Sequence, residues 1–351
     1  TSAEHLKQHT YLEYPERSAT KPWLQDVPAI IGLQPQWGRM GAEGLIALAS
    51  SLTGISPIKI YLYATASLAV TWFAVIYLAF LTFVSATIHR FTAAALVCLQ
   101  PIFIFFYANN NLPNLIGILT GGSAVIAIAR ASAAGWSRRN DFVAWSALGA
   151  LSLHGLLCTY PEMLPFILLP CGLLWLRPWF VRPARTYAFT SLMLLLVPFA
   201  GAAINPATTL RACHGFMTSF EAARNNNDWA NLFNPLIFAE YLPALATLSV
   251  PGAKSLGPWL GWPLSLLLVM TTVRIIRRSR DPFGLIATLS GGGALLGYTL
   301  ITHFLYGWQK TVQFSGVCVA LFFPVAAVEI LLHLRGERAG RSRRLAAVAV
   351  A

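Results

Sequence analysis

The chain has 351 residues, of which 56% are hydrophobic and only 11% are charged, and its net charge at neutral pH is +12. The apolar residues occur in runs longer than a soluble core helix or a buried strand needs, which excludes a disordered chain, a disulfide-rich secreted scaffold and a soluble nucleic-acid-binding protein. The five cysteines are scattered and lack metal-ligand spacing, so they indicate neither a disulfide framework nor a metal site. We interpret the chain as an integral membrane protein.

Residues 1–58 are predicted to form an extracytoplasmic loop. The chain opens at Thr1 without a Met and without a charged-then-apolar leader, so we expect further sequence upstream. Within Glu43–Thr53 the apolar residues recur at helical spacing, just after the basic residue Arg39. This pattern is typical of an interfacial helix that lies on the membrane surface.

Residues 59–335 are predicted to form an all-α, polytopic transmembrane helix bundle. Helices are expected because lipid offers no solvent to unpaired backbone groups, and a span needs about 20 apolar residues. The bundle is predicted to include an outer loop at 206–257 and to be followed by a basic cytoplasmic tail at 336–351. Nine spans are expected, at approximately 59–88, 92–107, 112–130, 142–159, 161–176, 187–205, 258–275, 283–305 and 311–333.

The distribution of basic residues predicts the orientation of the bundle. With these nine spans, most of the 25 lysines and arginines fall on one side of the membrane, and few of the acidic residues do. Because short cytoplasmic loops retain positive charge, that side is predicted to be cytoplasmic, together with the C-terminus. We therefore expect a multi-pass protein of a bacterial inner membrane, and topology alone explains the high positive charge.

Two outer connections are predicted to lie below the membrane surface. The spans around Tyr160-Pro161-Glu162 would reach only roughly 27 and 24 Å at about 1.5 Å per residue, and the span before Asn110 is also short. An acid held at that depth needs a partner or a water-filled cavity. Tyr306 and Lys310, at the outward start of the last span, are expected to face the same depression.

Several of these segments together resemble a known class of enzymes. They are the Arg39 loop with its interfacial helix, the Tyr107-to-Asn114 connection with Leu115-Ile116-Gly117, the Thr159-Tyr160-Pro161-Glu162 hairpin with Leu164-Pro165-Phe166, and the aromatic-plus-lysine start of the last span. In this order they resemble bacterial multi-spanning glycosyltransferases of the GT-C type, most clearly over residues 37–176 and 303–315. The resemblance implies a GT-C-like bundle whose extracytoplasmic loops carry interfacial helices.

The resemblance also implies a reaction: a sugar leaves a polyprenyl-phosphate donor at the outer face, with inversion, for a glycan, lipid or protein acceptor. It implies an extracytoplasmic acid as base, and Asp26 is the best-placed acid in the first loop, ahead of Glu16 and Glu43. From the residues themselves, Asp26 or Glu162 could take the proton while cations stabilise the departing phosphate. The predicted substrate-binding residues are Arg39, Asn110, Tyr160, Arg211, Tyr306 and Lys310. No cofactor or metal cluster is indicated, although a divalent cation between two separated acids remains an open alternative.

Other interpretations compete with this one. The same outward cavity would suit a transporter or flippase for a lipid-linked glycan, and a non-catalytic assembly subunit is a third class. Glu162 could simply cap a helix that Pro161 begins, and Lys310 could extend to the membrane surface. His154, inside a predicted span, is more often a packing residue than a proton relay.

Overall fold

The computed structural model describes residues 41–83, 112–181, 185–225, 270, 272–273, 276–277 and 281–302. These residues are helical apart from short turns, and none of them lies in a β-strand. The all-α prediction is therefore confirmed for the part of the chain that the structure describes. In chain order the helices are α3 (Gly41–Thr53), α4 (Pro57–Phe83), α7 (Leu112–Ala134), the 3₁₀ turn η2 (Trp136–Arg138), α8 (Arg139–Thr159), the 3₁₀ turn η3 (Pro161–Met163), α9 (Leu164–Val181), α10 (Arg185–Ile204), α11 (Pro206–Asn225) and α14 (Pro282–Ile301).

Three of these helical segments are long and apolar enough to cross a membrane: Pro57–Val75 of α4, all of α7, and Trp136–Thr159, which joins η2 to α8. A fourth is obtained if the bent pair α10 and α11 counts as one span. The chain thus has the helices of a membrane protein. The predicted spans at 92–107 and 311–333 lie outside the described residues, as does almost all of 258–275.

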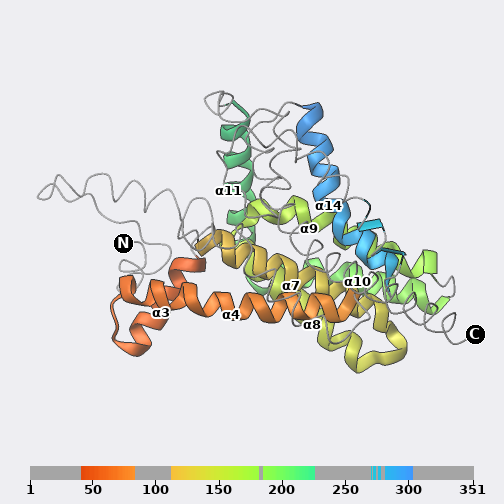
Figure 1. Ribbon diagram of the computed structural model, residues 1–351, viewed down its shortest axis with the longest axis horizontal. Coiled ribbons are helices and arrows are strands. Elements are labelled where there is room, and N and C mark those ends of the chain that lie inside the picture. Colours follow the sequence, from red (N-terminus) through yellow and green to blue (C-terminus); the bar gives the residue numbers. More distant parts are fainter. Residues whose placement is uncertain are drawn as a thin grey trace, which may run out of the picture.

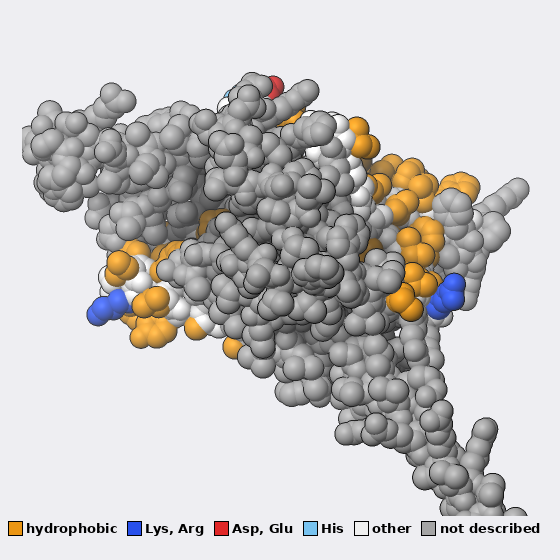
Figure 2. Space-filling view, turned by 45° about the horizontal axis from the view of Figure 1, so that its top comes forward, with side chains coloured by type: hydrophobic (Ala, Val, Ile, Leu, Met, Phe, Trp, Pro, Cys, Tyr) orange, Lys and Arg blue, Asp and Glu red, His pale blue; other side chains and the backbone are white. Residues whose placement is uncertain are grey.

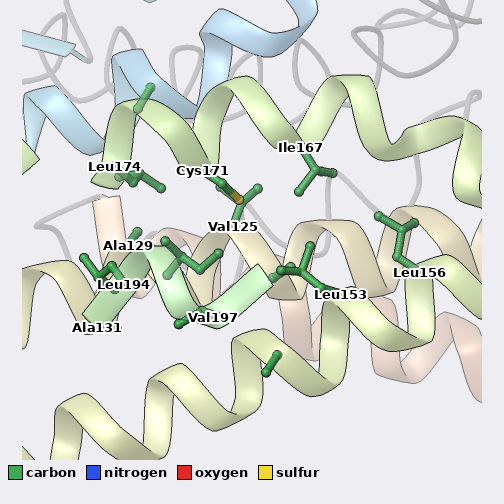
Figure 3. Packing of buried hydrophobic residues seen from close by; sticks show 14 of the residues in the cluster. Val125, Ala129, Ala131, Leu153, Leu156, Ile167, Cys171, Leu174, Leu194 and Val197 are labelled. Atoms are coloured by element: carbon green, nitrogen blue, oxygen red, sulfur yellow. The ribbon is translucent and has the colours of Figure 1, made fainter. Parts of the chain in front are cut away.

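The core forms where α7, α8, α9 and α10 meet. Figure 3 shows buried side chains from these four helices converging, among them Val125, Leu153, Cys171 and Val197. Small residues bring the backbones together, since a Cβ on Gly201 of α10 would lie 2.7 Å from a carbonyl oxygen of α8. Lipid tails are as apolar as leucine, so close van der Waals packing of this kind, rather than expulsion of water, holds membrane helices together.

The helix bounds correct the predicted lengths of the hairpin arms. Helix α8 begins at Arg139 rather than 142, and its 21 residues correspond to about 31 Å. Helix α9 continues to Val181 rather than 176. The prediction that the first arm is too short to span was therefore wrong, because Arg139, assumed to lie outside the helix, is its first residue. Helix α9 has 18 residues, which correspond to about 27 Å, and it is not among the segments long and apolar enough to cross a membrane.

A right-angle break separates α10 from α11. The chain turns by 97° around Asn205, whose side-chain oxygen accepts a hydrogen bond from the backbone N–H of Thr208 at 3.1 Å. Pro206 then opens α11, a position that suits proline because its missing N–H is not needed there. The predicted outer loop at 206–257 thus begins with a 20-residue helix, and Figure 1 shows α11 standing steeply relative to α7, in the upper part of the view.

Helix α3 confirms the helix expected within Glu43–Thr53. One of its sides, with Ala42 and Ile46, packs against Ile60 of α4 and Ile116 of α7. The other side carries Leu45, Leu48 and Leu52, which are exposed. Figure 2 shows that hydrophobic side chains also dominate other described parts of the surface, as expected for a molecule that faces lipid.

A buried ion pair joins α9 to α14. The guanidinium of Arg177 lies 3.0 Å from the carboxylate of Asp281, and only 13% and 11% of the two side chains are exposed. Asp281 also caps α14 by accepting a hydrogen bond from the N–H of Gly284 at 2.9 Å. Farther along, Gly291 of α14 lies directly against the Phe166 carbonyl and the ring of Pro170 on α9.

Candidate functional site

The candidate site is the tip of the α8–α9 hairpin, which comprises Thr159, Tyr160 and η3. Helix α8 ends where Tyr160 turns to an extended conformation, with φ of −153°, while its N–H still donates to the Leu156 carbonyl at 2.8 Å. Pro161 starts η3, and the Met163 N–H donates to the Tyr160 carbonyl at 3.1 Å. A residue before proline avoids the helical conformation, so the Tyr-Pro sequence itself fixes the turn.

Neighbouring helices enclose the tip. A Cβ on Gly117 of α7 would lie 2.5 Å from the Cβ of Tyr160, and one on Gly41 of α3 would lie 2.5 Å from the methyl group of Thr159. Tyr160 is accordingly only 3% exposed. Both glycines are needed because any side chain at these positions would push α3 or α7 away from the tip.

Glu162 is the ionisable residue of the tip. Both of its carboxylate oxygens are buried. Glu162 also precedes the first turn of α9, where the helix dipole favours a negative charge. The carboxylate of Glu162 is therefore shielded from water and is not a solvated surface group.

Helix α11 brings a basic residue to the same end of the bundle. It packs against both α8 and η3, and it carries Arg211, which is partly buried. The 97° break at Asn205 is what directs α11 across the tip instead of away from it. A cation and a buried acid therefore occur on two elements that are in direct contact.

The predicted site residues divide into two groups. Glu162, Tyr160 and Arg211 are on η3, on the turn before it and on the helix that packs against it. The remaining predicted residues lie outside the described part of the chain, so a cavity shared by Glu162 and Lys310 stays a prediction. They are Asp26, Arg39, Asn110, Tyr306 and Lys310.

Sequence reasoning placed Asn114 in an outer connection but did not select it as a site residue. Asn114 is only 2% exposed and lies one helical turn before Gly117, the residue that contacts Tyr160. A polar residue three positions before that glycine, on the same side of a largely apolar helix, is the pattern that could have identified it.

Farther along α8, His154 and Cys158 form a polar pair. The His154 Nε2 lies 3.5 Å from the Cys158 sulfur, which is the i, i+4 spacing of one helical turn. The described residues contain no group of three or more His, Cys, Asp or Glu side chains that could hold a metal ion. The pair is therefore a local contact within α8.

Neither a protein-family model, nor a curated protein, nor a solved structure matches the chain. A functional assignment therefore depends on the chemistry of the tip and on the resemblance carried by the sequence segments themselves.

Proposed function

We propose that the chain is a GT-C type glycosyltransferase of a bacterial inner membrane, with its C-terminus in the cytoplasm. It would transfer a sugar from a polyprenyl-phosphate donor to an acceptor hydroxyl at the extracytoplasmic face, with inversion at the anomeric carbon. The observation that supports this proposal is the buried carboxylate of Glu162 at the hairpin tip, which α7 and α11 each contact. A base shielded from bulk water at one end of a transmembrane bundle suits a reaction between a lipid-linked donor and an acceptor at the membrane surface.

In the proposed reaction Glu162 accepts the proton of the acceptor hydroxyl as that oxygen attacks the anomeric carbon. A new carbon–oxygen bond forms, the bond between the sugar and the phosphate oxygen breaks, and the polyprenyl phosphate leaves with the electron pair. General-base assistance of this kind contributes about 10²- to 10⁴-fold to a rate. Asp26 is the alternative base.

Cations are proposed to stabilise the negative charge that develops on the departing phosphate. Arg211 serves this role from α11, and Arg39 and Lys310 are the other proposed phosphate ligands. Tyr160 contributes by fixing the turn that places Glu162, while Asn110 and Tyr306 are proposed to contact the sugar or the acceptor.

The test uses the purified full chain in proteoliposomes with a panel of polyprenyl-phosphate hexoses and pentoses. Glu162→Gln should lower transfer by at least about 100-fold while the protein still binds the lipid carrier. Glu221→Gln is the matched control, because Glu221 is an exposed acid on α11. Asp26→Asn tests the alternative base.

Four outcomes distinguish the proposal from its rivals. Loss of transfer in Glu162→Gln alone supports Glu162 as the base, and loss only in Asp26→Asn would transfer that role to Asp26. Transbilayer movement of the lipid carrier without any glycan product from the unaltered protein would favour a flippase. Absence of both activities and of carrier binding would favour an assembly subunit.

A further inference from the structure

The turn between α7 and α8 places charged arginine side chains next to two apolar helices. Both flanking segments, Leu112–Ala134 and Trp136–Thr159, are long and apolar enough to cross a membrane. Gly135 makes the reversal with φ of 62°, in the left-handed region that favours glycine. A tight turn between two spans must lie close to a membrane surface, at the opposite end of α8 from the hairpin tip.

Three arginines surround this turn, and two of them stack on tryptophan rings. The guanidinium of Arg139 lies 5.3 Å from the ring centroid of Trp136, and that of Arg130 lies 5.9 Å from Trp145. Such cation–π contacts orient a guanidinium without neutralising its charge. Tryptophan is also the residue that favours the headgroup level of a bilayer.

Trp136 is held firmly in place. Its ring makes edge contacts with Phe142 of α8 and Phe189 of α10, at centroid distances of 5.7 and 4.8 Å respectively. Its backbone N–H donates to the Thr190 hydroxyl at 3.2 Å. The surface on which Arg139 rests is therefore built from α8, α10 and η2 together, and it needs no rearrangement to accept a ligand.

The charge of Arg138 is only weakly compensated within the described part of the chain. Its contact with Asp141 is 3.9 Å long, and the two side chains are 64% and 58% exposed. An exposed pair of that length contributes little, so Arg138 can still attract an anion. By contrast, the buried Arg177 faces Asp281 at 3.0 Å and is already neutralised.

An apolar stripe continues from the arginines along α8. Val143 lies one helical turn after Arg139 and is 50% exposed, and Leu151, two turns farther on, is 60% exposed. A soluble anion would make no favourable contact with this stripe. Fatty acyl chains would pack against it, because they extend from the headgroup level toward the bilayer centre.

We propose that this turn is a binding site for an anionic phospholipid, independent of the proposed transferase site. The phosphate contacts Arg138 and Arg139, and the acyl chains lie along Val143 and Leu151. The combination of a fixed cationic headgroup site and a contiguous apolar stripe selects a lipid over a free phosphate. Each basic residue near an anionic headgroup strengthens binding by about fivefold.

The test is native mass spectrometry of the delipidated full chain, titrated with equimolar phosphatidylglycerol and phosphatidylcholine of distinguishable mass. The unaltered protein should bind phosphatidylglycerol preferentially. The double variant Arg138→Gln/Arg139→Gln should lower the ratio of the two bound lipids by at least about fivefold. Arg138→Lys/Arg139→Lys keeps the charge and should retain most of the preference.

Lys59→Gln is the matched control, because Lys59 is an exposed cation on α4 at the other end of the bundle, and it should leave the lipid ratio unchanged. An unchanged ratio in the Arg138→Gln/Arg139→Gln variant would overturn the proposal. So would displacement of phosphatidylglycerol by excess inorganic phosphate to the level of that variant, because the site would then recognise a soluble anion.

Discussion

Replacing Asp281 with asparagine would break the buried ion pair while preserving the shape of the side chain. Asparagine can still accept the hydrogen bond from Gly284 that caps α14, so only the negative charge is lost. Arg177 would then keep its charge in a site where 13% of its side chain is exposed, with the Ala129 carbonyl, at 3.4 Å, as a remaining acceptor.

The expected cost follows from the burial of the pair. Removing one partner of a buried ion pair costs about 3–5 kcal/mol, because the other charge is left uncompensated. Arg177 keeps its contact with the Ala129 carbonyl and gains the dipole of the asparagine side chain. The expected loss of unfolding free energy in Asp281→Asn is therefore near the lower end of this range, at about 3 kcal/mol. Asp281→Ala also removes the helix cap and should cost about 1 kcal/mol more.

Reversible unfolding of the purified protein in mixed micelles measures these free energies. Asp141→Asn is the control, since its partner Arg138 is 3.9 Å away and both side chains are mostly exposed, so the expected cost is at most about 1 kcal/mol. The double variant Arg177→Met/Asp281→Asn should recover a large part of the lost stability, because no lone charge remains buried.

Equal costs for Asp281→Asn and Asp141→Asn would refute the reasoning, because burial would then make no difference to the strength of an ion pair. A double variant less stable than Asp281→Asn would refute it as well, since it would show that the site does not penalise an isolated arginine.

Three further results are expected. Gly291→Ala should lower the free energy of unfolding by about 1–3 kcal/mol, because the added Cβ would force α14 away from α9. Gly293→Ala should be nearly neutral, because a Cβ at that position meets no atom within 4 Å. Thermal unfolding in detergent measures both effects. Gly117→Ala should displace the tyrosine of the tip and lower transfer in the proteoliposome assay without abolishing it; unaltered transfer would contradict the packing of the tip. In single-cysteine variants, exposed Cys213 should react rapidly with a maleimide and buried Cys171 slowly, and equal labelling rates would contradict the packing of α9.

The helices were predictable because apolar runs of about 20 residues indicate membrane-spanning helices. The start of α7 at Leu112 and the helix within Glu43–Thr53 could be identified from the sequence alone. The start of α8 and the end of α9 could not, because a charged residue was assumed to lie outside a span. Arg139 instead stacks on Trp136, and Arg177 pairs with an acid from a distant segment, so both remain helical.

Helix α11 was predicted as part of a loop, although a local sequence pattern indicates its start. An asparagine followed by proline, as at Asn205 and Pro206, is a recognised helix start. The residues after it are mixed polar and apolar, so the segment lacks the uniformly apolar character that indicates a membrane span.

The burial of the acid at the tip has a different cause from the predicted one. Short spans were expected to draw Glu162 below the membrane surface, but α8 alone has 21 residues. The carboxylate is buried at a tip that α7 and α11 contact, and no sequence pattern predicts such long-range contacts. Arg211 was predicted as a site residue, but the contact of its helix α11 with η3 depends on the 97° break, and no sequence pattern predicts that angle.

The ion pair between Arg177 and Asp281 also has a consequence for biogenesis. Arg177 is synthesised well before its acidic partner, since the roughly one hundred intervening residues take on the order of 5–20 s to translate. During that interval the guanidinium of Arg177 lacks the carboxylate that it contacts in the folded chain. The ion pair can form only after Asp281 and α14 have been synthesised. The contact that joins α9 to α14 is therefore a late step in the assembly of the helices.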